Sequence, residues 1–409
     1  MLVSKLFTHT QKQDPKNEEA KNACLLTRAG FVYKNMAGVY SILPLGFRVL
    51  QNIRRIIREE LQTFGAEEVY LNELQNKETW SVSGRWNELK DVMYQFSDSR
   101  GKDIGLATTH EEVVAEIAKN YIHSYKDLPK GIFQIQDKFR NEPRARSGLL
   151  RGREFEMKDL YSFHADEECL DKYYQKVMEV YIRIFGRLGL DAIITNASGG
   201  TFTRDFSHEF QVISENGEDT IYVCEKCHKG KNKEIVAGAG VEDSDLVVKC
   251  DCGAEMKKKR SIEVGNIFKL GVKFSQAVGL NFSDKDGNRN PVIMASYGIG
   301  TTRVLAAIAE VLSDKNGLVW NAETAPYQMY LIDLTGAGFG LSENLSDVVL
   351  MDDRDASPGE KFADADLLGI PYRVVKSKKT ADKVEVKERV SGRIEVMEWD
   401  KFLEKLKRE

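Results

Sequence analysis

The sequence has few cysteines and no long apolar run, and each shortage excludes a class of protein. Its 409 residues include six cysteines, four of them in two close pairs, which does not match the disulfide framework of a secreted protein. No apolar run reaches the ~18 residues that a membrane-spanning helix needs. The N-terminal residues lack both an extended apolar core and a small-residue cleavage site. We therefore expect a cytoplasmic protein that does not span a membrane.

Positive charge is not in excess either. The 59 Lys and Arg residues are fewer than the 63 Asp and Glu residues, and the net charge is −4. A nucleic-acid partner would therefore be held by local patches and not by a generally basic surface. The length, with 42% hydrophobic and 30% charged residues, indicates a soluble globular protein of two or three domains.

Hydrophobic periodicity divides the chain in two. Residues 47–64 repeat apolar side chains at three- and four-residue steps and predict an amphipathic helix. Strands at 133–142 and 153–163, joined by a turn-rich segment, predict a long-looped antiparallel hairpin. We predict an α+β domain over residues 1–320, an antiparallel sheet flanked by helices, and a compact α/β domain over residues 321–409.

The hairpin stretch FRNEPRARSGLLRGREFEMKD gathers arginines around an aromatic residue. Because strand side chains alternate between faces, Arg140 and Glu142 share one face, and Arg151, Arg153 and Phe155 share one on the partner strand. Guanidinium groups match phosphate oxygens, a ring can stack on a base, and a carboxylate can accept from an amino group. This combination predicts a nucleoside triphosphate site. The alternative is an exposed hairpin with surface ion pairs.

A second stretch, VIMASYGIGTTRVLAAIAEVL, places Gly298 and Gly300 between a strand and a helix that carries Arg303 near its start. Glycines occur in many such turns, so the pair alone is weak evidence. The amides and dipole of a helix N-terminus, together with a guanidinium, favour phosphate.

These stretches resemble the class II aminoacyl-tRNA synthetases, and the prolyl-tRNA synthetase family in particular. FRNE and RGREF are similar to motif 2 of the class, YGIGTTR to motif 3, and LPLGFRVLQNIRRIIREEL with GAEEVYL to motif 1. TTHEE, FSHEF, EVGNIFKLG and GEKFADADLLGIPYRVV are similar to stretches found together in the family. The resemblance covers nearly the whole chain. It implies ATP-dependent ligation of L-proline to tRNA(Pro) through a prolyl-adenylate, with Mg²⁺, in a homodimer.

The resemblance also implies roles for single residues in ATP binding. Arg140 would hold the α-phosphate and the proline carboxylate, and Arg151 and Arg303 the γ-phosphate. Glu142 would accept from the adenine amino group, and Phe155 would stack on the ring. The residues implied to bind ATP are Arg140, Glu142, Arg151, Phe155, Gly298, Gly300 and Arg303, of which Arg140 and Arg303 would be catalytic.

Proline would be bound by Thr109, Glu111, Arg140 and His208. A carboxylate suits the imino group of proline, which is a cation with two donors. For His208 the alternative is a structural histidine whose hydrogen bonds are satisfied within the protein.

The C-terminal part resembles the anticodon-binding domain of this subclass. Asp353, Arg354, Lys361 and Asp364 are the candidates for reading the two guanines of a proline anticodon, because Arg and Asp match the acceptors and donors of guanine. Alternatively, these side chains pair with one another.

Cys224, Cys227, Cys250 and Cys252 lie in a short insertion, residues 215–262. Two close cysteine pairs predict a structural zinc site, although the second pair is Cys-x-Cys and a metal-free reduced loop is the alternative. Many bacterial relatives carry a large hydrolytic editing domain between the SHEF strand and motif 3. The insertion is too short for such a domain, so we predict a form that lacks it.

Three features depart from the family pattern: Asn72 follows the motif 1 strand in place of proline, Thr201 to Phe206 lengthen the segment before SHEF, and Asn266 stands where histidine is common. They affect expectations for the dimer interface and the pocket wall. Alternative functions are a threonyl or glycyl specificity, a regulatory homologue that charges no tRNA, and a zinc-ribbon nucleic-acid protein. TTHEE with FSHEF favours proline, and the combination of ATP residues with an anticodon domain favours an enzyme.

Overall fold

The computed structural model describes residues 1–409 except 17, 146, 201, 203–205, 237–246, 342–344, 346 and 409. Its contacts form two compact units. We call Ala37–Val39 with Arg54–Ala307 the large unit, and Met1–Met36, Tyr40–Ile53 and Ile308–Glu409 the small unit. The domain boundary expected at residue 320 stays a prediction, because these units are defined by contacts and not by independent folding.

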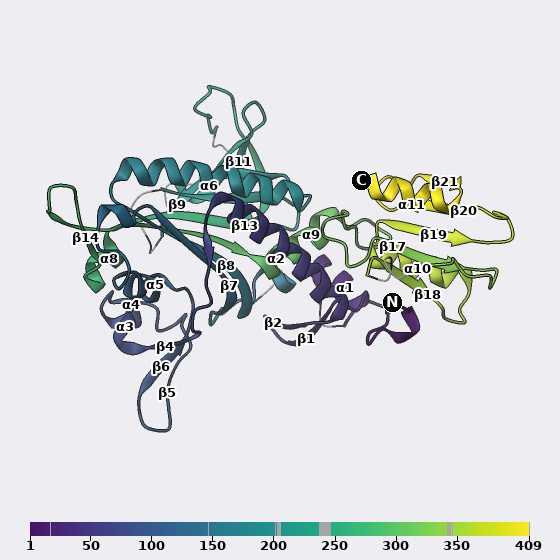
Figure 1. Ribbon diagram of the computed structural model, residues 1–409, viewed down its shortest axis with the longest axis horizontal. Coiled ribbons are helices and arrows are strands. Elements are labelled where there is room, and N and C mark those ends of the chain that lie inside the picture. The colour runs from purple at the N-terminus through teal and green to yellow at the C-terminus, as the bar shows by residue number, and fades with distance from the viewer. Residues whose placement is uncertain are drawn as a thin grey trace. The chain divides into compact units, whose positions relative to one another are not determined.

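A nine-stranded sheet forms the large unit (Figure 1), in the order β10-β9-β12-β11-β13-β16-β8-β7-β3. Only the β12–β9 and β3–β7 pairs in this sheet are parallel, so the expected antiparallel sheet is confirmed. The predicted hairpin is the pair β7–β8, in continuous register from Lys130 opposite Phe163 to Phe139 opposite Glu154. The strands are β3 (Glu67–Glu68), β7 (Lys130–Phe139), β8 (Glu154–His164), β9 (Ala192–Ser198), β10 (Phe206–Ile213), β11 (Asp219–Cys224), β12 (Lys229–Asn232), β13 (Lys257–Gly271) and β16 (Ile293–Gly300).

Strand β13 is longer than its sequence suggests. It begins with four consecutive cations, Lys257–Arg260, which show no alternation of apolar and polar residues. The strand nevertheless extends over 15 residues, because β11 and β10 pair with successive parts of it along one edge and β16 pairs along the other. Backbone partners from distant segments thus override a weak local pattern.

Helix α6 (Glu167–Arg187) packs on the sheet (Figure 1). It begins at Asp166, whose carboxylate accepts a hydrogen bond of 2.7 Å from the amide of Cys169. Its buried side chains recur every three or four residues, as an amphipathic helix on a sheet requires. They are Leu170, Tyr174, Val177, Met178, Val180, Tyr181, Ile184 and Phe185.

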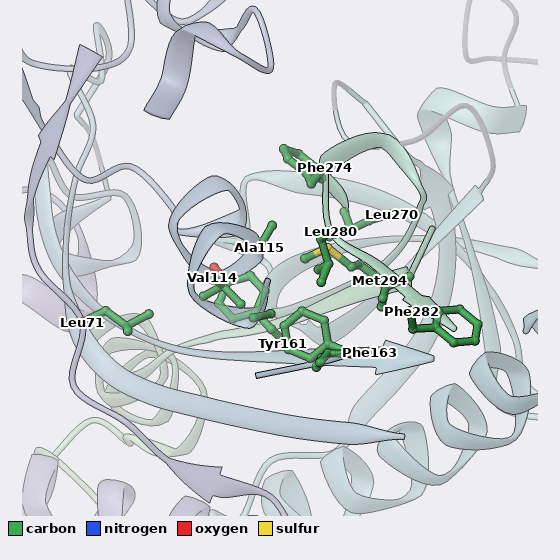
Figure 2. Packing of buried hydrophobic residues seen from close by; sticks show 13 residues of the cluster. Leu71, Val114, Ala115, Tyr161, Phe163, Leu270, Phe274, Leu280, Phe282 and Met294 are labelled. Carbon is green, nitrogen blue, oxygen red and sulfur yellow. The ribbon is translucent and has the colours of Figure 1, made fainter. Parts of the chain in front are cut away.

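A second apolar cluster holds helix α5 (Glu111–Ala118) against strands β8 and β16 (Figure 2). Val114 of α5 packs with Tyr161 and Phe163 of β8 and with Met294 of β16. Because α5 begins at Glu111, this packing fixes the TTHEE residues over the sheet. Further elements of the large unit are α3 (Lys77–Ser81), α4 (Arg85–Glu88), α7 (Lys233–Val236), α8 (Lys273–Val278), β4 (Leu74–Asn76), β5 (Gln95–Ser97), β6 (Asp103–Leu106), β14 (Asn281–Ser283) and β15 (Arg289–Pro291).

The small unit contains a five-stranded sheet in the order β18-β17-β19-β20-β21. These strands and helices α10 and α11 agree with the mixed α/β structure expected for residues 321–409, and the core of the sheet includes Leu331, Val374 and Phe402. Helix α10 begins with a capping box between Ser357 and Glu360. The elements are η1 (Val3–Lys5), α1 (Lys21–Arg28), β1 (Val32–Met36), β2 (Val39–Ile42), β17 (Met329–Asp333), β18 (Val349–Asp352), α10 (Pro358–Leu368), β19 (Tyr372–Lys376), β20 (Val384–Glu388), β21 (Ile394–Met397) and α11 (Trp399–Arg408).

Helices α2 (Pro44–Phe64) and α9 (Thr301–Leu312) each contribute residues to both units. Within the described part of the chain, every helix is too short or too polar to cross a bilayer.

Candidate active site

A cavity of about 290 Å³ lies at the end of the β7–β8 hairpin. Five of the seven residues expected to bind ATP line it, and the other two, Gly298 and Gly300, line an adjoining cavity of about 170 Å³. The lining of the first cavity is Arg140, Glu142, Leu149, Leu150, Arg151, Gly152, Phe155, Glu218, Asp219, Ile262, Glu263 and Arg303.

Arg140 is held at the point where the two cavities meet, and it lines both. Its guanidinium donates to the carbonyl of Thr108 at 3.2 Å and lies 5.2 Å from the ring centre of Phe155. Burial and the nearby Arg303 guanidinium lower the pKa of Arg140. Two guanidinium groups this close repel each other, and a bound anion would offset that repulsion.

Glu142 and Arg151 are paired with each other at 2.9 Å. Burial raises the pKa of Glu142, but Arg151 and the amide of Arg144 lower it by a larger amount. The net effect is a lowered pKa, so the carboxylate is ionised. Arg151 remains nearly half exposed, which leaves it able to turn toward a phosphate.

Arg303 is positioned by two contacts near the start of helix α9. Its Nε donates to the carbonyl of Leu150 at 2.8 Å, and its Nη1 lies 3.1 Å from Glu263 Oε2. A Cβ at Gly300 would come within 3.1 Å of the Arg303 Cβ, so glycine gives this arginine room. Glu263 lines both cavities. Its role is not apparent from the sequence, since nothing in EVGNIFKLG marks its carboxylate as facing the site.

The adjoining cavity contains Thr109 and Glu111 next to Arg140 and Phe155. The Thr109 hydroxyl donates to Glu111 Oε2. Phe202 and Asn266 also line this cavity, whereas residues 201 and 203–205 of the lengthened segment lie outside the described residues. Three of the four residues expected to bind proline therefore come together.

His208 is the exception. On β10 it pairs with Ile267 of β13, which lies between the cavity-lining residues Asn266 and Phe268 and faces the opposite side of the sheet. Its Nδ1 lies 3.0 Å from the hydroxyl of Tyr174 of α6. Burial lowers the pKa of His208 to about 4. This corrects the expectation that His208 lines the proline cavity: it is a neutral structural histidine.

A buried charge cluster beneath Glu111 was missed altogether by the sequence analysis. Arg85 Nη1 lies 3.3 Å from Glu111 Oε2 and 3.0 Å from each oxygen of Glu112. Burial raises the pKa of Glu112 and Arg85 lowers it in part. Arg85 precedes Glu111 by 26 residues, and no motif connects the two stretches.

The four residues expected to read the anticodon lie together in the small unit, but they have partners within it. Arg354 Nη2 lies 2.8 Å from Asp364 Oδ2, and Lys361 donates to the carbonyl of Asp352 at 3.2 Å. Residues of the N-terminal segment also take part, as Asp353 accepts from Ser4 and Asp364 accepts from Thr10. Within the described residues, the expected alternative of mutual pairing accounts for Arg354 with Asp364, whereas Asp353 and Lys361 have partners outside the four. Arg354 and Asp364 also line a cavity of about 820 Å³.

The four cysteines of the insertion converge. Their sulfur atoms all lie within 4.8 Å of one another, with Cys224 and Cys252 3.6 Å apart and Cys227 and Cys250 3.3 Å apart. The amide of Cys227 lowers the pKa of Cys224. Positive φ angles at His228 (54°) and Gly253 (84°) close the two turns, and residues 237–246 between them lie outside the described residues.

Comparisons with known proteins agree with this geometry. The model of the tRNA synthetase class II core domain (G, H, P, S and T) matches residues 94–312, and that of the anticodon binding domain matches residues 334–409. A proline–tRNA ligase of Sulfurimonas denitrificans is 38% identical over 398 residues, covering 92% of each chain. One from Syntrophus aciditrophicus is 33% identical over 549 positions, covering 96% of this chain and 95% of the relative.

A solved structure is also similar. It is a prolyl-tRNA synthetase from Cryptosporidium parvum in complex with halofuginone and AMPPNP, with a TM-score of 0.75 over 95% of this chain and 74% of that chain. Its sequence identity is 16%, so this likeness concerns the fold.

Proposed function

Because this chain belongs to the proline–tRNA ligase family of class II synthetases, which use ATP and Mg²⁺, we propose that its two adjoining cavities bind ATP and L-proline to form prolyl-adenylate. The observation that carries the proposal is that Arg140, Phe155, Glu263 and Arg303 line both cavities. A triphosphate in one and an amino acid in the other would then share one set of charged groups.

In this arrangement the first cavity takes ATP. Phe155 stacks on adenine, Glu142 accepts from its amino group, and Arg151 and Arg303 bind the γ-phosphate. Arg151 has to leave Glu142 to do so. Mg²⁺, when bound, neutralises triphosphate charge, and the Glu263 carboxylate between the two cavities is a ligand that fits it.

The second cavity takes proline, whose imino cation lies against Thr109 and Glu111 and whose carboxylate lies against Arg140. A carboxylate oxygen attacks the α-phosphorus, the bond between the α- and β-phosphates breaks, and pyrophosphate leaves with the bonding electrons. The terminal ribose hydroxyl of the tRNA then attacks the prolyl carbonyl and releases AMP. Since no side chain must act as a nucleophile, positioning and charge stabilisation supply the catalysis.

The test is amino-acid-dependent pyrophosphate exchange with each of the twenty amino acids. Proline should give by far the greatest exchange. Exchange with another amino acid and none with proline would contradict the proposed site, and strong exchange with threonine or glycine would favour the alternative specificities.

Arg140→Ala and Arg303→Ala test the charge roles. Each should lower proline-dependent exchange by about 10²–10³-fold, as expected when one preorganised donor to a developing charge is lost. The matched control is Arg144→Ala in the same hairpin, because Arg144 is exposed and lines neither cavity. Near-normal exchange in either variant would refute the role of that arginine.

We also propose a structural zinc ion at Cys224, Cys227, Cys250 and Cys252. Four thiolates at mutual distances below 4.8 Å fit the tetrahedral arrangement of such sites. Protein purified without chelator should contain about one zinc per chain, and Cys250→Ser should lose it while Cys169→Ser, outside the cluster, should not. Zinc-free wild-type protein would leave the metal-free loop as the correct alternative.

Two further proposals concern partners. We propose that the protein is a cytoplasmic homodimer, because its motif 1 stretch resembles the interface segment of the class; light scattering should give twice the mass of one chain.

We propose that Asp353, Arg354, Lys361 and Asp364 read the anticodon guanines after exchanging their present partners. Charging of tRNA(Pro) transcripts with either guanine replaced should then fall steeply while exchange is unaffected.

A further inference from the structure

Three ionisable side chains are buried together beneath the cavity proposed for proline. Arg85 and Glu111 are each 2% exposed, and Glu112 is 1% exposed. The guanidinium of Arg85 lies 5.1 Å from the ring centres of both Trp80 and Phe202. These rings separate Arg85 from water, so that its charge interacts more strongly with neighbouring charges than it would in water.

The two carboxylates are adjacent in sequence and share this one guanidinium. Two buried carboxylates so close together repel each other, and a cation that contacts both offsets that repulsion. Within the described residues, Arg85 is the cation that hydrogen-bonds to both. It therefore lowers the pKa of Glu112, against the raising effects of burial and of Glu111. Counted as charged groups, the two carboxylates and the guanidinium sum to one negative charge.

The contacts divide that charge unequally. Both oxygens of Glu112 accept hydrogen bonds from Arg85 at 3.0 Å, and one of them also accepts from the Ser83 hydroxyl at 2.7 Å. Glu111 accepts from Arg85 at the longer distance of 3.3 Å. Within the described residues, the hydrogen bonds from Arg85 and from Thr109 are both accepted by Oε2 of Glu111. Glu111 lines the cavity, and Glu112 is not among the lining residues. Arg85 thus mainly neutralises Glu112.

We propose that Arg85 and Glu112 are positioning residues that set the charge presented to the substrate. Arg85, held by Glu112, orients Glu111 and leaves it one net negative charge, which matches the single positive charge of an amino-acid imino group. This inference rests on the proposed function, in which Glu111 binds that group.

The decisive variants are Glu112→Gln alone and together with Arg85→Met. Glu112→Gln leaves Arg85 paired with Glu111 alone, so the formal charge of this cluster becomes zero and the KM for proline in pyrophosphate exchange should rise about tenfold or more. Adding Arg85→Met restores one net negative charge and should lower that KM by at least about threefold relative to Glu112→Gln. The KM for ATP should change by less than about twofold in both.

A structural role alone predicts the opposite order, because removing a second buried group would only add damage. A double variant with a higher proline KM than Glu112→Gln would therefore overturn the proposal. The matched control is Glu116→Gln, the same change on the exposed side of helix α5, which should leave both KM values unchanged.

Two measurements keep the test decisive if the double variant does not fold. Glu112→Asp keeps the charge and should hold the proline KM well below that of Glu112→Gln; equal values for the two would overturn the proposal. Wild-type protein without proline-dependent exchange would contradict the proposed function itself. Wild-type exchange with an unchanged Glu112→Gln would contradict only the role of Arg85 and Glu112.

Discussion

Buried lysines on the two faces of the large sheet have different surroundings. On the face toward α6, burial lowers the pKa of Lys158 well below its usual range, and the amine donates to the carbonyl of Tyr297 at 3.0 Å. On the other face, the equally buried Lys138 lies 3.1 Å from Asp159. Burial thus favours the neutral form of Lys158 on one face, whereas Lys138 lies beside a carboxylate on the face that holds the cavities.

His208 allows this difference to be measured at a single residue. Its pKa is about 4 in the folded protein and about 6.5 when unfolded. Below pH ~6.5 the unfolded chain binds a proton that the folded protein does not, so stability falls as the pH falls toward 4. Wild-type protein should lose up to about 3 kcal/mol relative to His208→Gln across this window, as measured by urea unfolding.

The control for the substitution itself is His123→Gln, the same change at an exposed histidine. His208→Gln should also leave the KM for proline unchanged, because the ring faces α6. A constant stability difference between pH 7 and pH ~4.5 would contradict the neutral buried state.

At the scale of elements, the N-terminal segment and helix α10 support each other within the small unit. Leu2 bridges to Met351 at the edge strand β18. Farther along the segment, Thr10 donates to Asp364 at 2.7 Å and Lys12 lies 3.2 Å from Glu360. The lysine pair is exposed and contributes little, so the hydroxyl contact carries more of the attachment.

Replacing Thr10 by valine tests that attachment. The change keeps the shape of the side chain but removes the donor to Asp364, which should lower the free energy of unfolding by about 1 kcal/mol. Thr10→Ser keeps the hydroxyl and should cost clearly less. The measurement is urea unfolding of both variants, and a larger loss in Thr10→Ser than in Thr10→Val would show that the methyl group, and not the hydrogen bond, makes the contact.

At the scale of the whole molecule, the chain is much shorter than some relatives that it matches from end to end. The alignment with the Syntrophus relative spans 549 positions, 140 more than the 409 residues of this chain. Between Ile213 and Ile262 the described residues form β11, β12, the short helix α7, the cysteine cluster and the start of β13. This small module lies between the SHEF strand and motif 3, the interval that we expected to be too short for an editing domain.

We therefore predict that the protein forms some alanyl-tRNA(Pro) and does not hydrolyse it. Alanine is smaller than proline and keeps its carboxylate and amine, and each missing methylene discriminates by only about 1–3 kcal/mol. The measurement is deacylation of preformed alanyl-tRNA(Pro) by the purified protein. A rate well above spontaneous hydrolysis would reveal an editing site and contradict this prediction.

The sequence by itself determined the features that depend on local spacing. Alternation in two neighbouring segments predicted the β7–β8 hairpin and placed Arg140 and Phe155 at its end, since a strand period of two needs no distant information. The helix that carries Arg303 near its start was expected as well, although Gly298 and Gly300 lie within strand β16 and not in a turn between strand and helix.

Tertiary structure alone decided the rest, because the contacts involved join segments far apart in the chain. Arg85 reaches Glu111 across 26 residues, and Ser4 reaches Asp353 across 349. The face of His208 depended on the register of β10 against β13, where a shift of one residue would have turned its ring toward the cavity. Local patterns specify which side chains share a face, whereas only pairing with distant strands decides which face becomes the active site.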